Sequence, residues 1–116
     1  MVALDLFAGI LVSDYARSLA WYERLLGSPP AFLPNAIEAV WELAEHRYLY
    51  IEERTEGAGQ ALVTIFVDDL NGQVASSAAR GVEPEQRETY DNGVRKITFR
   101  DPDGNEIGFG GAPLEA

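Results

Sequence analysis

The pattern of apolar and polar positions predicts two similar series of elements, one in each half of the chain. The first strand, over 2–12, alternates two sets of side chains that are both largely apolar, so neither face is expected to be freely solvated. A helix then runs to Gly27, because Asp14 can cap its start and Pro29 prevents its continuation. The apolar stripe predicted for this helix consists of Tyr15, Leu19, Tyr22 and Leu26.

The rest of the chain is predicted to form short strands and one further helix, which Asp68 or Asp69 can cap. Asn92-Gly93 is a strong two-residue hairpin signal, so the strands on either side of it should pair. The remaining elements expected are strands at 31–33, 37–44, 48–53, 61–67, 85–90, 94–100 and 106–110, and a helix at 70–80 with an apolar stripe of Leu70, Val74 and Ala78.

These two series form an internal repeat. Val12 and Val67 lie 55 positions apart, and each is followed by a capping Asp, a helix and a terminal Gly. The segment 55–60 is the only linker-like stretch. We therefore expect a single domain over 1–116, built from modules of about 1–57 and 58–116.

Charge and composition restrict the function classes. The net charge of −10 repels nucleic acid and anionic membranes, and it would attract cationic ligands, although acidity also serves solubility. The chain has no cysteine, no apolar run long enough to cross a bilayer and no basic region of the kind that opens a signal peptide. We expect a soluble cytoplasmic protein with no nucleic-acid and no membrane partner.

Two segments carry a family resemblance. One is Val12-Ser13-Asp14, followed through Trp21-Tyr22 by Leu25-Leu26-Gly27; the other is Asp101-Pro102-Asp103-Gly104-Asn105. Together they resemble the vicinal oxygen chelate superfamily, which holds glyoxalase I, the extradiol dioxygenases and the bleomycin-resistance proteins. The resemblance implies an α+β fold in which two βαβββ modules form a curled mixed sheet around a cleft. It also implies metal ligands on the first and fourth strands of each module.

The ligand positions implied by the resemblance fall on residues that bind metals poorly. They are Phe7 and Leu62 on the first strands, and Tyr50 and Gly108 on the fourth. Divalent ions need carboxylate, imidazole or carbonyl donors, and only a neutral phenol is present in this set. A one-residue slip of the alignment would turn the whole set to the other face of the sheet. We therefore expect no metal and no cofactor.

Nearby polar side chains leave alternatives open. Asp5, Glu52, Glu106 and Thr64 share the parity of these positions, so two or three carboxylates could hold a metal; we favour strand-end carboxylates that face water. The only histidine, His46, lies at an expected hairpin tip over 45–47, where a solvated turn residue is the favoured interpretation. Without it no Ser-His-Asp triad can be assembled, and no P-loop or dinucleotide motif occurs.

An aromatic and apolar surface takes the place of the metal site in this interpretation, and glycines at 9 and 108 are expected to leave room within it. The alternative is that these side chains fill the space and no pocket exists. Trp41 is included although the sequence does not fix which face it occupies. The candidate ligand-binding residues are Phe7, Leu11, Trp41, Tyr48, Tyr50, Leu62, Thr64, Phe66, Glu106 and Gly108.

The resemblance favours the metal-free, bleomycin-resistance branch. Such proteins bind a flat, often cationic, aromatic compound such as an antibiotic, commonly as homodimers with the cleft shared between subunits. The alternative is a glyoxalase-like lyase or isomerase, or a dioxygenase-type enzyme, with an atypical metal site or with acid–base chemistry on Glu106, Glu52 or Tyr50. A third alternative is a scaffold domain with a filled cavity.

Overall fold

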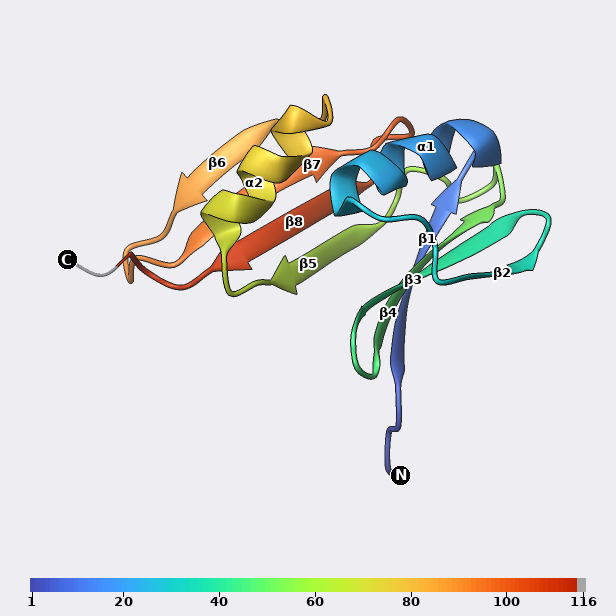
Figure 1. The fold of residues 1–116 in the computed structure, drawn as a ribbon, viewed down its shortest axis with the longest axis horizontal. Helices are drawn as coiled ribbons and strands as arrows, with labels where there is room; N and C mark the ends of the chain where they lie inside the picture. Colours follow the sequence, from blue (N-terminus) through green and yellow to red (C-terminus); the bar gives the residue numbers. More distant parts are fainter. Residues whose placement is uncertain (115–116) are drawn as a thin grey trace.

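The computed structural model describes residues 1–114 and contains two consecutive βαβββ modules (Figure 1). This confirms the predicted α+β class, and most elements begin and end within a few residues of their predicted bounds. The first module comprises β1 (Leu6–Val12), α1 (Tyr15–Leu26), β2 (Phe32–Asn35), β3 (Glu38–Ala44) and β4 (Arg47–Glu53). The second comprises β5 (Leu62–Phe66), α2 (Leu70–Ala79), β6 (Gln86–Thr89), β7 (Arg95–Arg100) and β8 (Glu106–Gly111).

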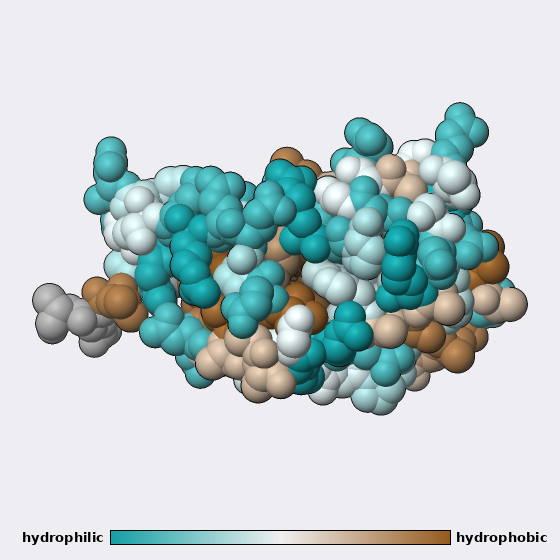
Figure 2. Space-filling model, turned by 90° about the horizontal axis from the view of Figure 1, so that it is seen from above, coloured by the Kyte–Doolittle hydropathy of each residue, from teal (hydrophilic) through white to brown (hydrophobic). Residues whose placement is uncertain are grey.

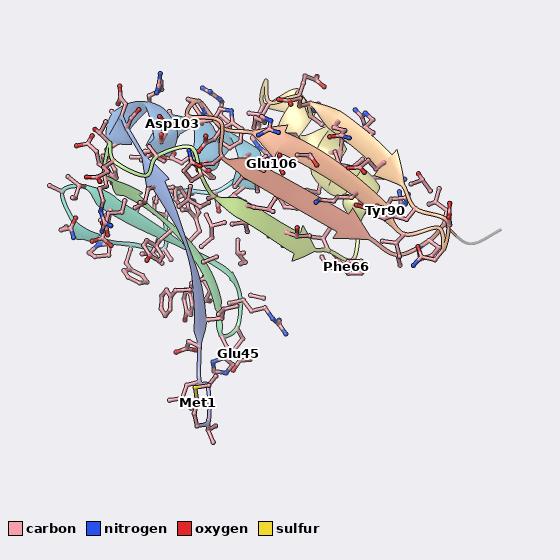
Figure 3. The ribbon with its side chains drawn as sticks, turned by 180° about the vertical axis from the view of Figure 1, so that it is seen from behind. Met1, Glu45, Phe66, Tyr90, Asp103 and Glu106 are labelled. Carbon is pink, nitrogen blue, oxygen red and sulfur yellow. The ribbon has the colours of Figure 1, made fainter. Side chains whose placement is uncertain are left out.

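Each module forms its own four-stranded sheet. Sheet A has the order β1-β4-β3-β2 and sheet B the order β5-β8-β7-β6, with a parallel pair at β1–β4 and another at β5–β8. The strands β1 and β5 are therefore edge strands, and the two sheets do not join within the chain. The lower parts of β1 and of the β3–β4 hairpin project away from sheet B, as the positions of Met1 and Glu45 show (Figure 3).

The predicted caps position both helices. The Asp14 side chain accepts a hydrogen bond from the Arg17 backbone N–H at 3.1 Å, and the Asp69 side chain accepts one from Gly72 at 3.0 Å. Helix α1 ends at Gly27, whose φ of 81° lies in the left-handed region that favours glycine. Within residues 1–114, no helix is both long and apolar enough to cross a membrane.

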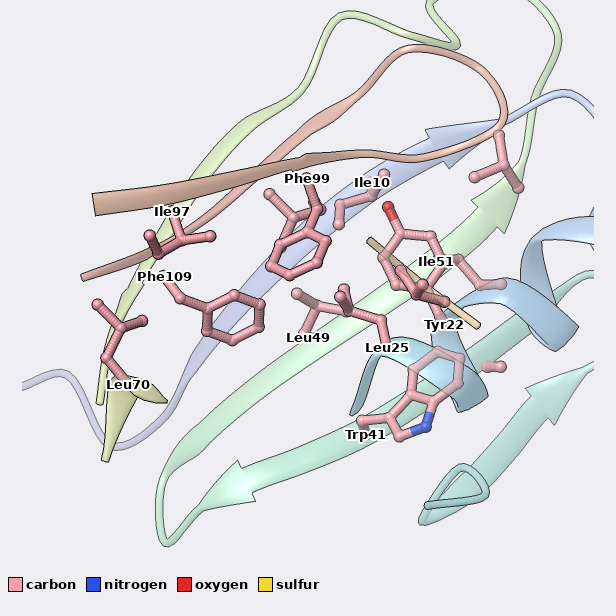
Figure 4. Close-up of a cluster of buried hydrophobic side chains, with 14 residues drawn as sticks. Ile10, Tyr22, Leu25, Trp41, Leu49, Ile51, Leu70, Ile97, Phe99 and Phe109 are labelled. Carbon is pink, nitrogen blue, oxygen red and sulfur yellow. The ribbon is translucent and has the colours of Figure 1, made fainter. Parts of the chain in front are cut away.

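One hydrophobic core lies between the helices and the two sheets (Figure 4). Helix α1 contacts both β4 and α2, so its buried face is centred on Ser18, Tyr22 and Leu25. The predicted stripe is confirmed: Tyr22 is fully buried, and Tyr15, Leu19 and Leu26 are partly buried against the core. The largest fully buried side chains include Tyr22, Phe99, Ile10, Leu25, Leu49, Ile51 and Ile107.

The turn after β7 joins the second module to the first. Asp101 is 5% exposed, and its carboxylate accepts hydrogen bonds from the Tyr22 hydroxyl at 2.8 Å and from the Asn105 backbone and side chain. The Asn105 side chain in turn donates to the Leu11 carbonyl at 3.0 Å. The residues of the Asp-Pro-Asp-Gly-Asn motif therefore fix how the two modules pack together.

A second contact of the same turn reaches the start of α1. Asp103 accepts hydrogen bonds from the Ser13 backbone N–H at 3.0 Å and from the Ser13 hydroxyl. The guanidinium of Arg17 lies 3.6 Å from the same carboxylate. Both halves of the sequence resemblance, the Val-Ser-Asp segment and the Asp-Pro-Asp-Gly-Asn segment, thus meet at one junction.

Candidate functional site

The open face of sheet A, meaning the face turned away from the helices, follows from the strand register. Phe7 pairs with Tyr48, Gly9 with Tyr50 and Leu11 with Glu52, so the first two strands contribute alternate residues to this face. The pairing of β3 with β4 and of β2 with β3 adds the other members. The open face of sheet A consists of Phe7, Gly9, Leu11, Phe32, Glu38, Val40, Glu42, Tyr48, Tyr50 and Glu52.

Aromatic rings lie flat on this face. The rings of Phe7 and Tyr48 stack with their centroids 4.4 Å apart and their planes 11° from parallel. The Tyr50 ring covers Gly9, since a Cβ atom built on Gly9 would lie 2.6 Å from the Tyr50 hydroxyl oxygen. The expectation that Gly9 leaves an open space is therefore wrong, because the aromatic ring of the adjacent strand fills it.

Acidic groups accompany these rings. A hydrogen bond to the Glu42 carboxylate is the main cause that raises the pKa of Tyr48, followed by burial and by the charges of Glu42, Asp5 and Glu45. The Tyr48 hydroxyl is protonated at neutral pH and can donate a hydrogen bond. Glu52 is already engaged, because Arg54 lies 2.7 Å from its carboxylate. The described open face of sheet A holds no basic residue.

The open face of sheet B follows from the same kind of register. Leu62 pairs with Glu106, Thr64 with Gly108, and Gly108 with Thr98 across β8. Figure 3 shows Phe66 at the end of β5 and Glu106 at the start of β8. The open face of sheet B consists of Leu62, Thr64, Phe66, Gln86, Glu88, Lys96, Thr98, Arg100, Glu106, Gly108 and Gly110.

Its glycines are covered as well. A Cβ atom on Gly108 would lie 2.7 Å from Cε of Lys96, and one on Gly110 would lie 2.9 Å from the ring of Phe66. The expected open space at Gly108 is therefore occupied by the Lys96 side chain. Beside it, Glu106 is held by Arg100 at 2.5 Å.

The two open faces divide the predicted ligand-binding residues. Sheet A carries Phe7, Leu11, Tyr48 and Tyr50, while sheet B carries Leu62, Thr64, Phe66, Glu106 and Gly108. Trp41 lies apart from both groups. It is 2% exposed on the helix side of sheet A, and its indole N–H donates to the Ser28 carbonyl at 3.0 Å. Trp41 is thus a core residue that packs beside Tyr22.

A cavity of about 320 Å³ lies where the projecting part of sheet A faces β5. Tyr48, Thr64 and Phe66 reach its lining, together with apolar side chains of both sheets such as Leu49 and Val63. Figure 2 shows the molecule from above, on the side of the helices, where the surface is mostly hydrophilic and hydrophobic groups are visible near its middle. Within one chain, this cavity is the place where predicted residues of the two sheets come together.

The residues at the four inferred metal positions do not fit a metal ion. Phe7 and Leu62 carry no donor atom, and the Lys96 stem covers the position of Gly108. Among residues 1–114, no three or more His, Cys, Asp or Glu side chains gather in a way that could hold a metal. His46 is exposed in its turn with a φ of 67°, and its ring faces Asp5 and Glu45.

Comparison with known proteins identifies the family of this chain. The family model of the Glyoxalase/Bleomycin resistance protein/Dioxygenase superfamily matches residues 3–109. The chain belongs to this superfamily. A glyoxalase/bleomycin resistance protein from Catenulispora acidiphila DSM 44928 has the same fold with a TM-score of 0.92 and 54% identity, over 95% of this chain and 99% of that chain.

Solved structures with lower identity show the fold alone. TnmS3, an antibiotic binding protein from Streptomyces sp. CB03234, has a TM-score of 0.75 and 22% identity over 97% of this chain and 98% of its own. A lactoylglutathione lyase from Agrobacterium tumefaciens has a TM-score of 0.70 and 16% identity over 92% of each chain. No curated protein matches the chain. Since the fold occurs in a binding protein and in an enzyme, function must be argued from the site.

Among the open-face residues that sequence reasoning did not name, three bear directly on the candidate site. Phe32 and Glu42 extend the aromatic and acidic surface of sheet A, and Lys96 lies on sheet B. The alternation along β7 could have predicted the position of Lys96. Ile97 and Phe99 are buried on the helix side, so Lys96 must face the open side. It is also the only lysine in the chain.

Proposed function

We propose that this protein binds a small aromatic molecule without a metal, in the manner of the bleomycin-resistance branch of its superfamily. The observation that carries the proposal is the set at the inferred ligand positions, Phe7, Tyr50, Leu62 and Gly108. These residues lie on the open faces, and on sheet A the rings of Phe7 and Tyr48 stack beside them. Such a surface stacks on a flat ligand. Sequestration of an antibiotic in the cytoplasm is the role that fits this chemistry.

The proposed site is completed by a second copy of the chain. Both β1 and β5 are edge strands, and their side chains are unusually exposed for apolar residues: Leu6 is 73% exposed, Phe7 47%, Leu62 68% and Phe66 64%. Exposed apolar edge strands are hazards unless another chain covers them. A homodimer that places β1 of one copy against β5 of the other would cover them. It would also bring the two open faces around one cleft.

The chemistry of sheet A favours a ligand with a cationic group. The carboxylates of Glu38 and Glu42 lie on the same face as the rings of Tyr48 and Tyr50. A cation over an aromatic face is attracted by the ring and by neighbouring carboxylates. The net charge of −10 adds a long-range attraction for the same group.

The enzymatic alternative has less support from the contacts. Acid–base chemistry on Glu106 or Glu52 needs a carboxylate that is free to exchange a proton with a substrate. Glu106 is paired with Arg100 at 2.5 Å, and Glu52 with Arg54 at 2.7 Å. In each pair the guanidinium engages one oxygen of the carboxylate, so neither carboxylate is free of a partner.

Metal analysis separates binding protein from metalloenzyme. Elemental analysis after mild purification, followed by calorimetric titration with Zn²⁺, Ni²⁺ and Mn²⁺, is expected to give no stoichiometric ion. One tightly held ion per chain that is lost in Glu106→Gln or Glu52→Gln would contradict the proposal and favour the enzyme.

A ligand screen tests binding directly. We expect a fluorescence or calorimetric screen of aromatic compounds, cationic and neutral, to find ligands that bind more weakly to Tyr50→Ala. The loss of one stacking partner corresponds to about 0.5–1.5 kcal/mol beyond the buried area. Tyr90→Ala is the matched control, because Tyr90 is exposed and lies near the far end of sheet B (Figure 3). If nothing binds, the scaffold alternative replaces the proposal.

Light scattering coupled to size exclusion tests the second copy. The expected mass is about twice that of the 12.7 kDa chain. Phe7→Glu should shift the protein toward monomer, because it places a charge on the edge that the partner would cover. A monomer at micromolar concentration would exclude a cleft shared between subunits.

A further inference from the structure

We infer that Lys96 anchors an anionic oxygen of the aromatic ligand on the open face of sheet B. This inference deepens the proposed function and rests on it. Lys96 is the only lysine of the chain. It lies on the inner strand β7, near one end of the face, opposite Gly110 on β8 and opposite Glu88 on β6.

The Lys96 side chain lies across β8 instead of extending along the strand edge. Its Cε atom is 2.7 Å from the place of a Cβ atom on Gly108, and the hydroxyl oxygen of Thr64 is 3.6 Å from the same point. Gly108 occupies the position in the second module that Tyr50 occupies in the first, counted from the paired strands. The absence of a side chain at Gly108 is what lets the lysine lie there.

The ammonium group is not committed to another side chain. Among residues 1–114, no hydrogen bond or ion pair is found for Lys96, although Glu88 faces it across β7 and β6. Arg100 on the same face is different, because Glu85 and Glu106 hold its guanidinium at 2.9 and 2.5 Å. Of the two cations on this face, only Lys96 is therefore available to a ligand.

Its neighbours on the face include two hydroxyls as well as the Glu88 carboxylate on β6. The hydroxyls of Thr64 and Thr98 share the face, and Thr98 is 5% exposed. Hydrogen bonds between an ammonium and a carboxylate are shorter and stronger than neutral ones. The net charge of −10 opposes an anion at a distance, but salt screens that repulsion beyond about 8 Å at physiological ionic strength.

The two open faces then select different parts of one ligand. Both sheets carry carboxylates, but sheet A adds stacked aromatic rings, and sheet B adds an uncommitted ammonium and hydroxyls. The ligand class that satisfies the second set is an aromatic compound with a carboxylate or another anionic oxygen at one edge. A cationic group elsewhere on the same molecule would meet Glu38 and Glu42.

The test compares 2-naphthoate with its uncharged isostere, 2-naphthamide, by calorimetry on the full chain. We expect wild type to bind the carboxylate about tenfold more tightly, as one hydrogen bond to a charged group allows. Lys96→Met should abolish this preference and leave naphthamide binding unchanged. Arg87→Met is the matched control, since it removes the same charge from β6 but on the other face, opposite Ile97.

A second measurement needs no variant. Reductive methylation with ¹³C-formaldehyde labels one lysine and the terminal amine, and the dimethylated lysine keeps its charge. Naphthoate should shift the Lys96 resonance saturably, and naphthamide should shift it less.

The outcomes distinguish the two proposals. Equal binding of the two naphthalenes to wild type, or a preference that persists in Lys96→Met, would overturn the role of Lys96 and leave the proposed function standing. So would failure of both naphthalenes when another compound of the screen binds. If no aromatic compound binds at all, the proposed function fails and the anchor fails with it.

Discussion

The open faces of sheets A and B differ in chemistry although the strands beneath them have the same order and register. Each sheet pairs its first and fourth strands in parallel, and each places a glycine under a long side chain of a neighbouring strand. In sheet A, Tyr50 covers Gly9; in sheet B, Lys96 covers Gly108. One face is aromatic and acidic, and the other carries hydroxyls and an uncommitted ammonium.

This difference shows which part of a duplicated module is constrained. The helix sides of both sheets share one core, so their residues must pack against each other. The open faces make no such contact within the chain, and their residues are free to differ as long as strand parity is kept. The predictions below compare the helix side with the open side, and then one open face with the other.

The largest effect is expected at the junction that holds the two sheets together. Asp101→Ala removes the acceptor for the Tyr22 hydroxyl and for the Asn105 backbone and side chain, all of them buried. Leaving such donors unpaired should lower the free energy of unfolding by about 4 kcal/mol. Urea denaturation measures it, with Asp91→Ala in the exposed β6–β7 turn as control. A loss below 1 kcal/mol would mean that the junction does not couple the modules.

Adjacent residues of β4 separate the two sides of sheet A. Ile51 is fully buried on the helix side, and Ile51→Ala should cost about 3 kcal/mol through lost contacts and a cavity. Tyr50 lies on the open side, and Tyr50→Ala should cost clearly less because its ring is half-buried. Thermal unfolding of both variants measures the difference. Equal costs would place Tyr50 in the core and contradict a free open face.

Alkaline pH should lower the free energy of unfolding through Tyr22, which is buried on the helix side. Burial, together with Asp101 and Asp103, raises the pKa of Tyr22 far above its ordinary value. Above pH 10 the unfolded chain therefore loses this proton while the folded chain keeps it, and stability present below pH 10 is lost as pH rises. The slope due to one such group is about 1.4 kcal/mol per pH unit.

Tyr22→Phe isolates that contribution. Its unfolding free energy, measured by urea denaturation between pH 9 and 12, should fall less steeply than that of wild type by this amount. The lost hydrogen bond to Asp101 adds an offset at all pH values but no slope. Parallel pH dependence of the two proteins would show that Tyr22 ionises readily in the folded state.

The helices, strands and face assignments could be predicted because local chemistry fixes them. Asp14, Gly27 and Asn92-Gly93 act within a few residues, and the alternation along β4 decides which side chains share a face. Helix-side burial of Trp41 could not be predicted, since it depends on the register of β3 against β4 and on the distant Ser28 carbonyl.

The contents of the candidate site were harder to foresee for a related reason. A glycine in a strand predicts space, but whether a neighbour fills it depends on the cross-strand register and on side-chain length. Tyr50 and Lys96 fill the spaces at Gly9 and Gly108 from strands on either side of the parallel pairs. The exposure of Leu6, in turn, differs from the pattern that predicts both faces of the first strand to be covered, and a second copy would cover it.

The smallest expected effect distinguishes the two glycines. Neither has a positive φ, so alanine is compatible with the backbone and reduces the entropy lost on folding by about 0.5 kcal/mol or somewhat more. At Gly108 the new methyl group meets Cε of a flexible lysine, which can move aside, so Gly108→Ala should change stability by less than about 0.5 kcal/mol. At Gly9 the methyl group meets the rigid Tyr50 ring at 2.6 Å and must displace the ring from the sheet, so Gly9→Ala should destabilise the protein by about 1 kcal/mol.

The double variant Gly9→Ala/Tyr50→Ala should be more stable than the sum of the two single changes predicts, because the ring that clashes is gone. Urea denaturation of the four proteins measures this coupling, and strict additivity would mean that Tyr50 does not rest on Gly9 in solution.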